Sequence, residues 1–480
     1  MSESDVLDSR RAGPAALRGS AMRSGAYLAG VVLSIVSAPL IIRHLGVGEF
    51  GRYVTVVSLM NLVGGVTEGG LNAIALREYA TLRGDARRDA LRGLMGLRWA
   101  LSLGGMAVGI LFALVAGYDS PLVFGAVGAG VAVVLQAVQM LVATPLQGEL
   151  RFGWVSTLQL LGQALSVALV VVLVLADAGL VAFLWVAAPV SGLLLVLTVA
   201  LVGRDMPLRP SLRWASVWPL LRDTLPFTVA VALNVVYFRV TILVMSLQAS
   251  ALETGYFATS FRVVEVLLGV PALVVGAAYP ILARAERDDQ ARFAYAMRRI
   301  LELSLLLGTW MAMCCVSGAQ LAIDILAGHE GQPAVAVLRI QGLTLVATGA
   351  AVAAGYGLLT LRRYREMLLL NAGALVLTVI LTLALVPTLG ARGAAIATLG
   401  TETAVAVGVI AVLVGLRPEL RPGLRGAVPI LAVGGAGVAA GLLLGLPPLA
   451  ALVVANAVFA AGLVAVRRVP PELRDVLRRG

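Results

Sequence analysis

The amino-acid sequence predicts an all-α, polytopic membrane protein with about 14 transmembrane helices. Of its 480 residues, 60% are hydrophobic and only 13% are charged, against roughly 25% charged residues in soluble domains. Apolar runs of roughly 20 residues, the length that crosses a bilayer, recur along the whole chain. The polar segments between these runs are short and hold most of the arginines, which is typical of loops at a membrane surface.

The hydrophobic runs define the predicted spans in order along the chain. They alternate with short polar connections, and the longest internal connection is basic and rich in proline. The predicted spans are 21–43, 51–77, 94–117, 121–146, 155–176, 179–202, 223–247, 254–282, 298–317, 333–360, 366–386, 393–416, 427–445 and 447–466.

The arginines set the predicted orientation. With both termini on the cytoplasmic side, almost every arginine falls in an inner segment, as the positive-inside rule requires. An error in one span would invert this charge pattern downstream, and no inversion occurs. The exceptions are Arg43, Arg52 and Arg392 in outer turns and Arg239, Arg262 and Arg339 within spans.

A short internal repeat predicts two six-helix lobes. Residues 49–53 (EFGRY) lie between the first two spans, and residues 253–257 (ETGYF) lie between spans seven and eight. Both read E-x-G-x-aromatic at the same topological position, which favours two halves related by an axis along the membrane normal, with a site at their interface. The predicted parts are a cytoplasmic tail 1–20, an N-lobe 21–203, a cytoplasmic linker 204–222, a C-lobe 223–417, two accessory helices within 427–466 and a cytoplasmic tail 467–480.

A polar stripe runs along the second span. Ser58, Asn61, Gly65, Glu68 and Asn72 recur at steps of three and four, so one continuous helix would place them on one face. A carboxylate at membrane depth is costly and usually faces a bundle interior or a transport path, which indicates a water-filled cavity. The alternative is that Glu68 and the asparagines only join helices through hydrogen bonds.

Spans seven and eight hold the charged candidates for a binding site. Arg262 and Glu265 are three residues apart and share a helical face; they either neutralise each other against another helix or face a ligand. Asn234 and Tyr237 share a face of span seven. Arg239 lies off that face at a depth where we expect an anionic ligand, or else backbone carbonyls or Glu265, as its partner.

Two further candidates lie in the second half. Arg339 is near the outer end of span ten, where it either extends to the surface or faces the cavity. Glu402, in span twelve, is a candidate proton or cation site, and interhelical hydrogen bonding is the alternative. We expect no metal site, because His44 and His329 lack ligand spacing.

The sequence contains no lysine, and this excludes some mechanisms. A Walker A phosphate loop needs its lysine, so the chain is not a standard P-loop ATPase. A lysine Schiff base is excluded as well, and we expect no cofactor. The basic charges are scattered over many loops, which argues against nucleic-acid binding and favours contact with anionic membrane lipids.

The segment IIRHLGVGEFGRYVTVVSLMNLV, followed by LNAIALREYA, carries a family resemblance. Its L-G-x-x-E-F-G-x-Y turn and terminal R-E-x-A (Arg77 to Ala80) resemble the N-terminal helices of bacterial polysaccharide-biosynthesis flippases. These are the O-antigen and exopolysaccharide transporters of the multidrug/oligosaccharidyl-lipid/polysaccharide (MOP) superfamily. The similarity covers residues 25–80 well and spans seven and eight more loosely. The family commonly has lysines in its inner loops and cavity, and this chain has none.

The resemblance implies a MATE-like transporter, not an enzyme, with two lobes that alternate between inward-open and outward-open states. Its implied cargo is a lipid-linked oligosaccharide or polysaccharide precursor of the polyprenyl-pyrophosphate type, moved across the bacterial cytoplasmic (inner) membrane for lipopolysaccharide or exopolysaccharide export. Cavity arginines would hold the pyrophosphate, which suits their fork of donors. Glycosyltransferases or a polymerase of the same pathway are the implied partners.

Three other functions remain open at this point. A cation-coupled multidrug exporter of the same fold would depend on Glu68 or Glu402 instead of arginines. A membrane glycan polymerase or ligase would be expected to have a large outer loop, and the sequence shows none. A non-transporting scaffold in glycan assembly would bind partners through the inner loops.

Overall fold

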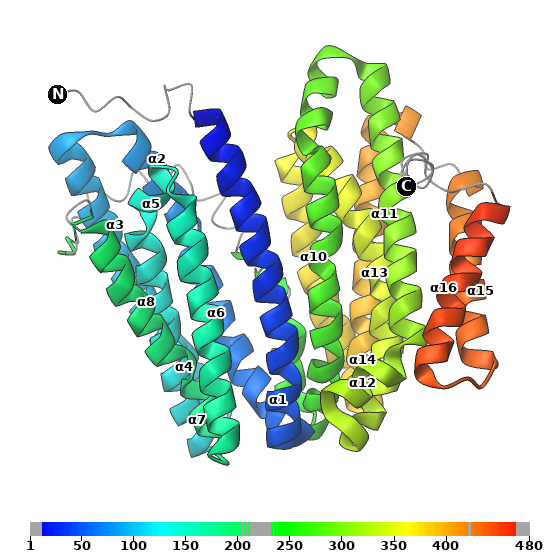
Figure 1. The fold of residues 1–480 in the computed structure, drawn as a ribbon, viewed down its shortest axis with the longest axis horizontal. Helices are drawn as coiled ribbons and strands as arrows, with labels where there is room; N and C mark the ends of the chain where they lie inside the picture. Colours follow the sequence, from blue (N-terminus) through cyan, green and yellow to red (C-terminus); the bar gives the residue numbers. More distant parts are fainter. Residues whose placement is uncertain are drawn as a thin grey trace. The chain divides into compact units, whose positions relative to one another are not determined.

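The computed structural model describes residues 12–203, 206–207, 209–211, 232–233, 235–237, 239–420 and 424–466. Every regular element in these ranges is a helix (Figure 1), which confirms the predicted all-α class. The chain divides into two compact units. Unit 1 comprises residues 1–45 and 52–239, and unit 2 comprises residues 46–51 and 240–480. The predicted lobe bounds remain predictions, and most of the predicted linker 204–222 and all of the tail 467–480 lie outside the described residues.

Unit 1 is built around α4. This helix contacts α3, α7 and α8, and it is the most buried of the candidate spans. Small residues permit this: a Cβ added at Gly125 would lie 2.1 Å from Leu184, and one at Gly128 would lie 2.5 Å from the ring of Trp185. Close approach of this kind is how helices associate in lipid. The helices are α1 (Ala12–Glu68), α2 (Leu71–Thr81), α3 (Gly84–Val115), α4 (Ser120–Val142), α5 (Thr144–Gly148), α6 (Phe152–Leu175), α7 (Leu180–Trp185) and α8 (Ala187–Val202).

Unit 2 is built around α13, which contacts α10, α11, α12 and α14. One buried cluster joins α10, α11, α12 and α13 through Val264, Met311, Ile323 and Leu338. The helices are α10 (Ala251–Asp288), α11 (Gln290–Ser317), α12 (Ala319–Ala327), α13 (Gln332–Thr360), α14 (Tyr364–Leu416), α15 (Leu424–Leu443) and α16 (Pro448–Ala465), with short 3-10 turns η2 (Gly328–Gly331) and η3 (Pro418–Leu420).

The last two helices pack mainly on α11. Met313 of α11, Val433 of α15 and Phe459 of α16 form a small apolar cluster. Polar contacts accompany this cluster: the Trp310 Nε1–H donates to Asn456 Oδ1 at 2.9 Å, and the Asn456 amide also lies within 3.8 Å of the Cys314 sulfur. The accessory position expected for residues 427–466 stays a prediction.

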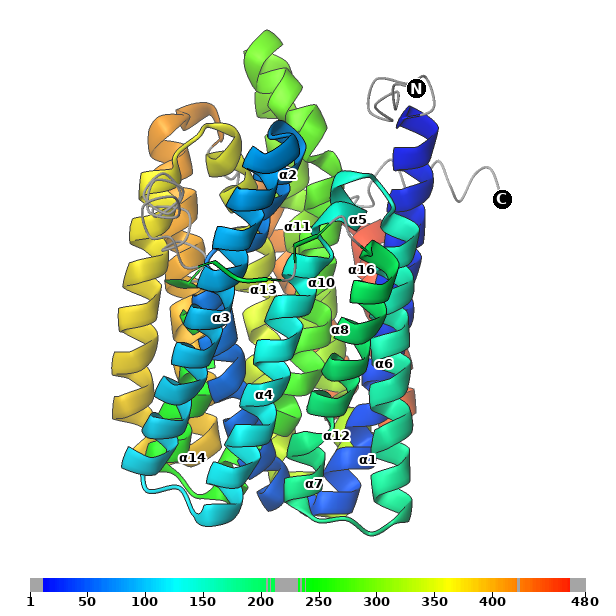
Figure 2. The same cartoon turned by 90° about the vertical axis from the view of Figure 1, so that its left-hand side faces the viewer.

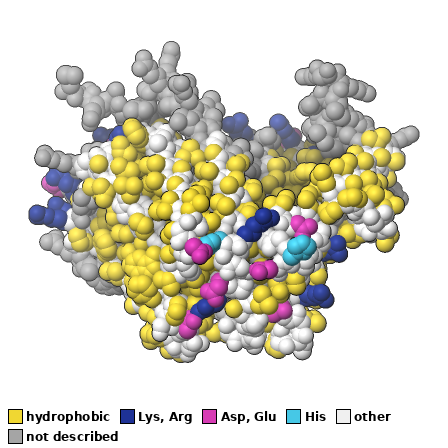
Figure 3. Space-filling view, turned by 60° about the horizontal axis from the view of Figure 1, so that its bottom comes forward, with side chains coloured by type: hydrophobic (Ala, Val, Ile, Leu, Met, Phe, Trp, Pro, Cys, Tyr) yellow, Lys and Arg dark blue, Asp and Glu magenta, His cyan; other side chains and the backbone are white. Residues whose placement is uncertain are grey.

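Ten of the described helices are long and apolar enough to cross a membrane, and two shorter apolar helices, Arg239–Gln248 and Ala427–Leu443, accompany them. Hydrophobic side chains cover much of the described surface in view, and charged and histidine side chains lie in smaller groups among them (Figure 3). These features establish a multi-pass membrane protein. The predicted count of fourteen spans is not confirmed and stays a prediction.

Two helices continue through positions where the sequence predicts a break. In α1 the backbone is non-helical at Gly46, with φ of 76°, and in α14 it is non-helical at Gly390, with φ of 55°. Glycine adopts these left-handed angles without steric penalty. The predicted boundaries after 21–43 and after 366–386 are thus present as single-residue breaks, not as open loops.

The glycines of the two E-x-G-x-aromatic copies, Gly51 and Gly255, approach each other in unit 2. A Cβ on Gly51 would lie 2.2 Å from the carbonyl oxygen of Ala251, and one on Gly255 would lie 2.0 Å from that of Val47. Each motif glycine therefore faces the backbone just before the other copy, and a Cβ on Gly51 would also lie 2.6 Å from the backbone nitrogen of Gly255. Glu253 of the second copy accepts a hydrogen bond from the Ala391 N–H at 2.6 Å, directly after Gly390. The motif thus lies at a close backbone crossing, and its Glu253 caps the helical segment that resumes after Gly390.

We expect Gly255→Ala to destabilise the protein by about 1–3 kcal/mol, because backbone atoms cannot move aside as a flexible side chain does. Gly48→Ala, three residues before Gly51, is the matched control, since a Cβ there meets nothing within 4 Å. The measurement is the apparent melting temperature of each purified variant in detergent. Equal melting temperatures for the two variants would show that the crossing is looser than the structure describes.

Candidate functional site

The predicted polar stripe is shorter than the sequence analysis expected. The helix α1 ends at Glu68, and Gly69 and Gly70 both have positive φ, so Asn72 belongs to the separate helix α2. The prediction that Asn72 continues the face of α1 is therefore wrong, because two adjacent glycines turn the chain there. The Gly70 N–H donates to Glu68 Oε2 at 3.1 Å, so this carboxylate also caps the turn.

The remaining stripe residues have different surroundings. Ser58 is fully buried, whereas Asn61 is exposed. Gly65 is packed, because a Cβ there would lie 2.4 Å from Val235. The Asn72 amide nitrogen approaches the sulfur of Met140 at 3.9 Å. Only part of the stripe is accessible in unit 1, and this part includes Asn61.

Arg98 of α3 is a charged group that the sequence analysis assigned to an inner segment. Its side chain is 1% exposed. The Nε–H donates to the carbonyl oxygen of Ala137 in α4 at 2.9 Å, and Nη1 is buried without a partner in the described part of the chain. Glu68 interacts with this guanidinium electrostatically. Unit 1 therefore holds a buried cation whose acidic neighbour is the carboxylate of the polar stripe.

The position of Arg98 was detectable in the sequence. It is the fifth residue of the predicted span 94–117, and an arginine within a span is costly unless it has a partner. Its place near the end of the span makes it resemble a loop arginine. Gly96, two residues earlier, packs against the backbone of Ser211.

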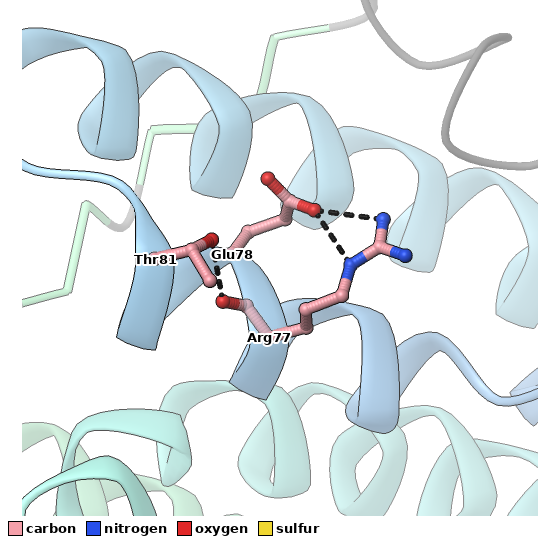
Figure 4. A network of polar contacts seen from close by, with 3 residues as sticks. All are labelled: Arg77, Glu78 and Thr81. Carbon is pink, nitrogen blue, oxygen red and sulfur yellow. Dashed lines mark hydrogen bonds and ion pairs between the residues drawn. The ribbon is translucent and has the colours of Figure 1, made fainter.

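The R-E-x-A motif forms a local polar network at the end of α2 (Figure 4). Both Nε and Nη2 of Arg77 donate to Glu78 Oε1, at 3.0 and 2.9 Å. The Thr81 hydroxyl donates to the Arg77 carbonyl oxygen at 2.9 Å. Glu78 is nearly buried, and Arg77 is half exposed. The motif therefore keeps a carboxylate neutralised where α2 ends.

The predicted pair in α10 is present in unit 2. Arg262 Nη1 donates to Glu265 Oε2 at 2.9 Å, and the two side chains are 35% and 30% exposed. Ala258, one turn earlier on the same face, is 3% exposed. The charged pair on this face is thus accessible, whereas Ala258 is not.

Two buried polar pairs join α13 to its neighbours, and Glu402 of α14 belongs to one of them. The Thr348 hydroxyl donates to Glu402 Oε2 at 2.8 Å, and the Ser260 hydroxyl donates to Gln341 Oε1 at 2.6 Å. Glu402 is 8% exposed. The hydrogen bond to Thr348 joins two helices, as the interhelical alternative for Glu402 requires.

The other predicted residues are not brought into one described cluster. Arg339 is half-buried in α13, and its Nε has no partner among the described residues. Tyr237 and Arg239 are half-buried and each makes contacts. Asn234 lies outside the described residues. No group of three or more His, Cys, Asp or Glu side chains that could hold a metal ion occurs in the described ranges.

Long apolar helices, two compact units and few charged groups within the helices define a multi-pass membrane protein. The chain belongs to the polysaccharide biosynthesis protein family, whose model matches residues 40–336. The match begins at the first residues of the motif from which the sequence resemblance was drawn, and it confirms that resemblance. No curated protein matches the chain.

Similar solved structures support the same fold. The lipid II flippase MurJ in an inward closed conformation has a TM-score of 0.75 and 12% identity, with 93% of this chain and 98% of that chain covered. An inward-facing multidrug resistance MATE transporter has a TM-score of 0.56 and 16% identity, with 85% of this chain and 95% of that chain covered. A MOP superfamily transporter from Pyrococcus furiosus has a TM-score of 0.52 and 16% identity, with 85% of this chain and 94% of that chain covered. At these identities the similarity establishes the fold.

We expect Arg98→Met to lower the free energy of unfolding by about 1–3 kcal/mol, the range for a lost hydrogen bond to a charged group. Glu68→Gln should destabilise as well, because it removes the charge that compensates Arg98. The double variant should be less destabilised than the sum of the two. Melting temperatures in detergent provide the measurement, with exposed Arg88→Ala as control. Simple additivity would show that the two charges do not interact.

Proposed function

We propose that the protein flips a lipid-linked oligosaccharide or polysaccharide precursor across the bacterial cytoplasmic membrane by alternating access. Membership of the polysaccharide biosynthesis protein family supports this most directly. The fold is similar to that of a lipid II flippase over nearly the whole of both chains. The proposed cargo is a polyprenyl-pyrophosphate-linked glycan whose head passes through the protein while its lipid tail stays in the membrane.

Arg262 is the proposed principal ligand of the pyrophosphate. Its guanidinium is partly accessible and is oriented by Glu265 through a hydrogen bond of 2.9 Å. Arginine binds phosphate oxygens in a bidentate geometry, which a second positive group strengthens. Arg239, and Arg339 near the outer end of its helix, are proposed as further cationic groups along the path, and Asn61, Asn72, Asn234 and Tyr237 as polar groups for the sugar.

The membrane potential is the proposed driving force. The sequence lacks the lysine that a P-loop ATPase requires. A membrane potential that is negative inside drives negative charge outward, by ~2.3 kcal/mol per charge per 100 mV. A pyrophosphate with about two negative charges would therefore be exported without ATP.

The carboxylates have a different proposed role from that in a cation-coupled exporter. Glu402 accepts a hydrogen bond from Thr348, and Glu68 accepts one from the Gly70 N–H and interacts with Arg98. Both are engaged in structure. These contacts favour the flippase over a multidrug exporter that would use Glu68 or Glu402 as its cation site.

We expect Arg262→Ala to abolish flipping of a fluorescent undecaprenyl-pyrophosphate disaccharide in proteoliposomes, because the pyrophosphate loses its bidentate partner. Arg262→Lys should retain part of the rate, since an ammonium keeps the charge but not the fork. The rate of the wild-type protein should rise when an inside-negative potential is imposed. The measurement is the fraction of lipid that becomes accessible to a membrane-impermeant quencher.

Arg363→Ala is the matched control for this experiment. Arg363 pairs with Glu366 at 3.3 Å in the same i, i+3 geometry and is exposed to a similar degree, but it lies at the start of α14. Flipping should be unchanged in this variant. Unchanged flipping in Arg262→Ala would remove Arg262 from the site. A wild-type protein that flips no lipid-linked glycan but exports cationic drugs would support the exporter, and one that does neither would support the scaffold.

A further inference from the structure

We propose that unit 1 binds the phosphate of an anionic phospholipid in a pocket at the start of α6. The pocket has a volume of about 370 Å³ and is lined by Arg151, Gly153, Trp154 and Thr157. It combines a cation, an aromatic ring and a backbone position without a side chain. The inference concerns a lipid of the surrounding bilayer and does not depend on the proposed cargo.

A chain of contacts from α2 and α3 holds Arg151 in place. The Arg87 guanidinium carbon lies 4.5 Å from the centroid of the Tyr79 ring, and the Tyr79 hydroxyl donates to Glu149 Oε1 at 2.8 Å. Glu149 Oε2 lies 3.6 Å from Arg151 Nη1. Tyr79 occupies the variable position of the R-E-x-A segment, so the end of α2 and the pocket arginine are linked through one carboxylate.

The packing beneath this chain is tight. A Cβ added at Gly148 in α5 would lie 2.5 Å from the ring of Tyr79, so α2 and α5 are in direct contact. Figure 2 shows α2 and α5 at the same end of unit 1, beside the start of α6. This contact fixes the turn that leads into α6 and hence the position of Arg151.

The charges of the cluster favour an anion. Arg87 and Arg151 contribute two positive charges, and Glu149 contributes one negative charge, so the cluster has a net positive charge. The contact between Arg151 and Glu149 uses one terminal nitrogen, whereas a guanidinium carries five N–H groups. The Arg151 side chain is 38% exposed. A phosphate diester could therefore receive a bidentate pair of hydrogen bonds from Arg151.

The surface beyond the pocket suits acyl chains. Trp154, Thr157 and Leu161 follow one another at steps of three and four residues, so they share one face of α6. Trp154 and Leu161 are both exposed large apolar side chains. Tryptophan is enriched where the polar and apolar parts of a bilayer meet. A phospholipid with its phosphate at Arg151 would thus extend its chains along this face.

The test uses quenching of Trp154 fluorescence by brominated lipid. The protein is reconstituted in phosphatidylcholine vesicles that contain brominated phosphatidylglycerol or, in the matched series, brominated phosphatidylcholine. Subtracting the signal of Trp154→Phe isolates this tryptophan from the other five. We expect phosphatidylglycerol to quench at about fivefold lower mole fraction, the preference expected from one arginine near the surface.

Substitutions then distinguish lipid binding in the pocket from a general attraction of anionic lipid to the basic surface. Arg151→Ala should remove the preference, and Arg151→Lys should keep part of it. Arg88→Ala should leave it intact, because Arg88 is an exposed arginine of unit 1 with its own acidic partner, Asp85. Equal quenching by both lipids in the wild type, or a preference that survives in Arg151→Ala, would overturn the proposal.

A competition experiment with the wild-type protein requires no variant to fold. Unbrominated phosphatidylglycerol should restore Trp154 fluorescence, and unbrominated phosphatidylcholine should not. The undecaprenyl-pyrophosphate disaccharide is the second competitor. If it restores the fluorescence where phosphatidylglycerol fails, the pocket belongs to the transported lipid and the phospholipid assignment is wrong.

Discussion

The scarcity of hydrogen-bond partners in lipid determines most of this structure. Every backbone polar group in the bilayer must be satisfied within the protein, which leaves helices as the suitable element. Side chains meet the same requirement locally: the hydroxyls of Thr67, Thr198 and Thr401 donate to carbonyl oxygens four residues earlier in their own helices. Polar groups that depart from this pattern, such as Arg98 and Glu402, bond across to a neighbouring helix. They therefore mark positions where two helices cannot separate without losing a buried partner.

The sequence predicted the helical class and the family because both rest on patterns of neighbouring residues. Apolar runs of bilayer length and the turn at residues 45–53 are visible in one dimension. The Arg262–Glu265 pair was predictable for the same reason, since three-residue spacing determines a shared face on any helix. Asn72 was misplaced because Gly69 and Gly70 were read as part of an uninterrupted helix, although two adjacent glycines favour a turn in a soluble or a membrane protein alike.

Other contacts depended on information that the sequence does not hold. The hydrogen bond between Thr348 and Glu402 joins residues 54 positions apart, and the one between Arg98 and the Ala137 carbonyl joins residues 39 apart. Neither pairing follows from helical periodicity, because periodicity gives the face of a helix and not its neighbour. The repeat at residues 49–53 and 253–257 was visible as a sequence match, but the contact between its two glycines required coordinates.

The attachment of α15 and α16 bears on how such a chain evolves. Their contacts lie mainly on α11, through Met313 and the hydrogen bond from Trp310 to Asn456. Without them, α11 would expose apolar side chains that lipid covers as readily as a helix does. A gene encoding the preceding helices could therefore acquire or discard this hairpin in one event. The contacts of α13 with α10, α11, α12 and α14 thus do not involve the two C-terminal helices.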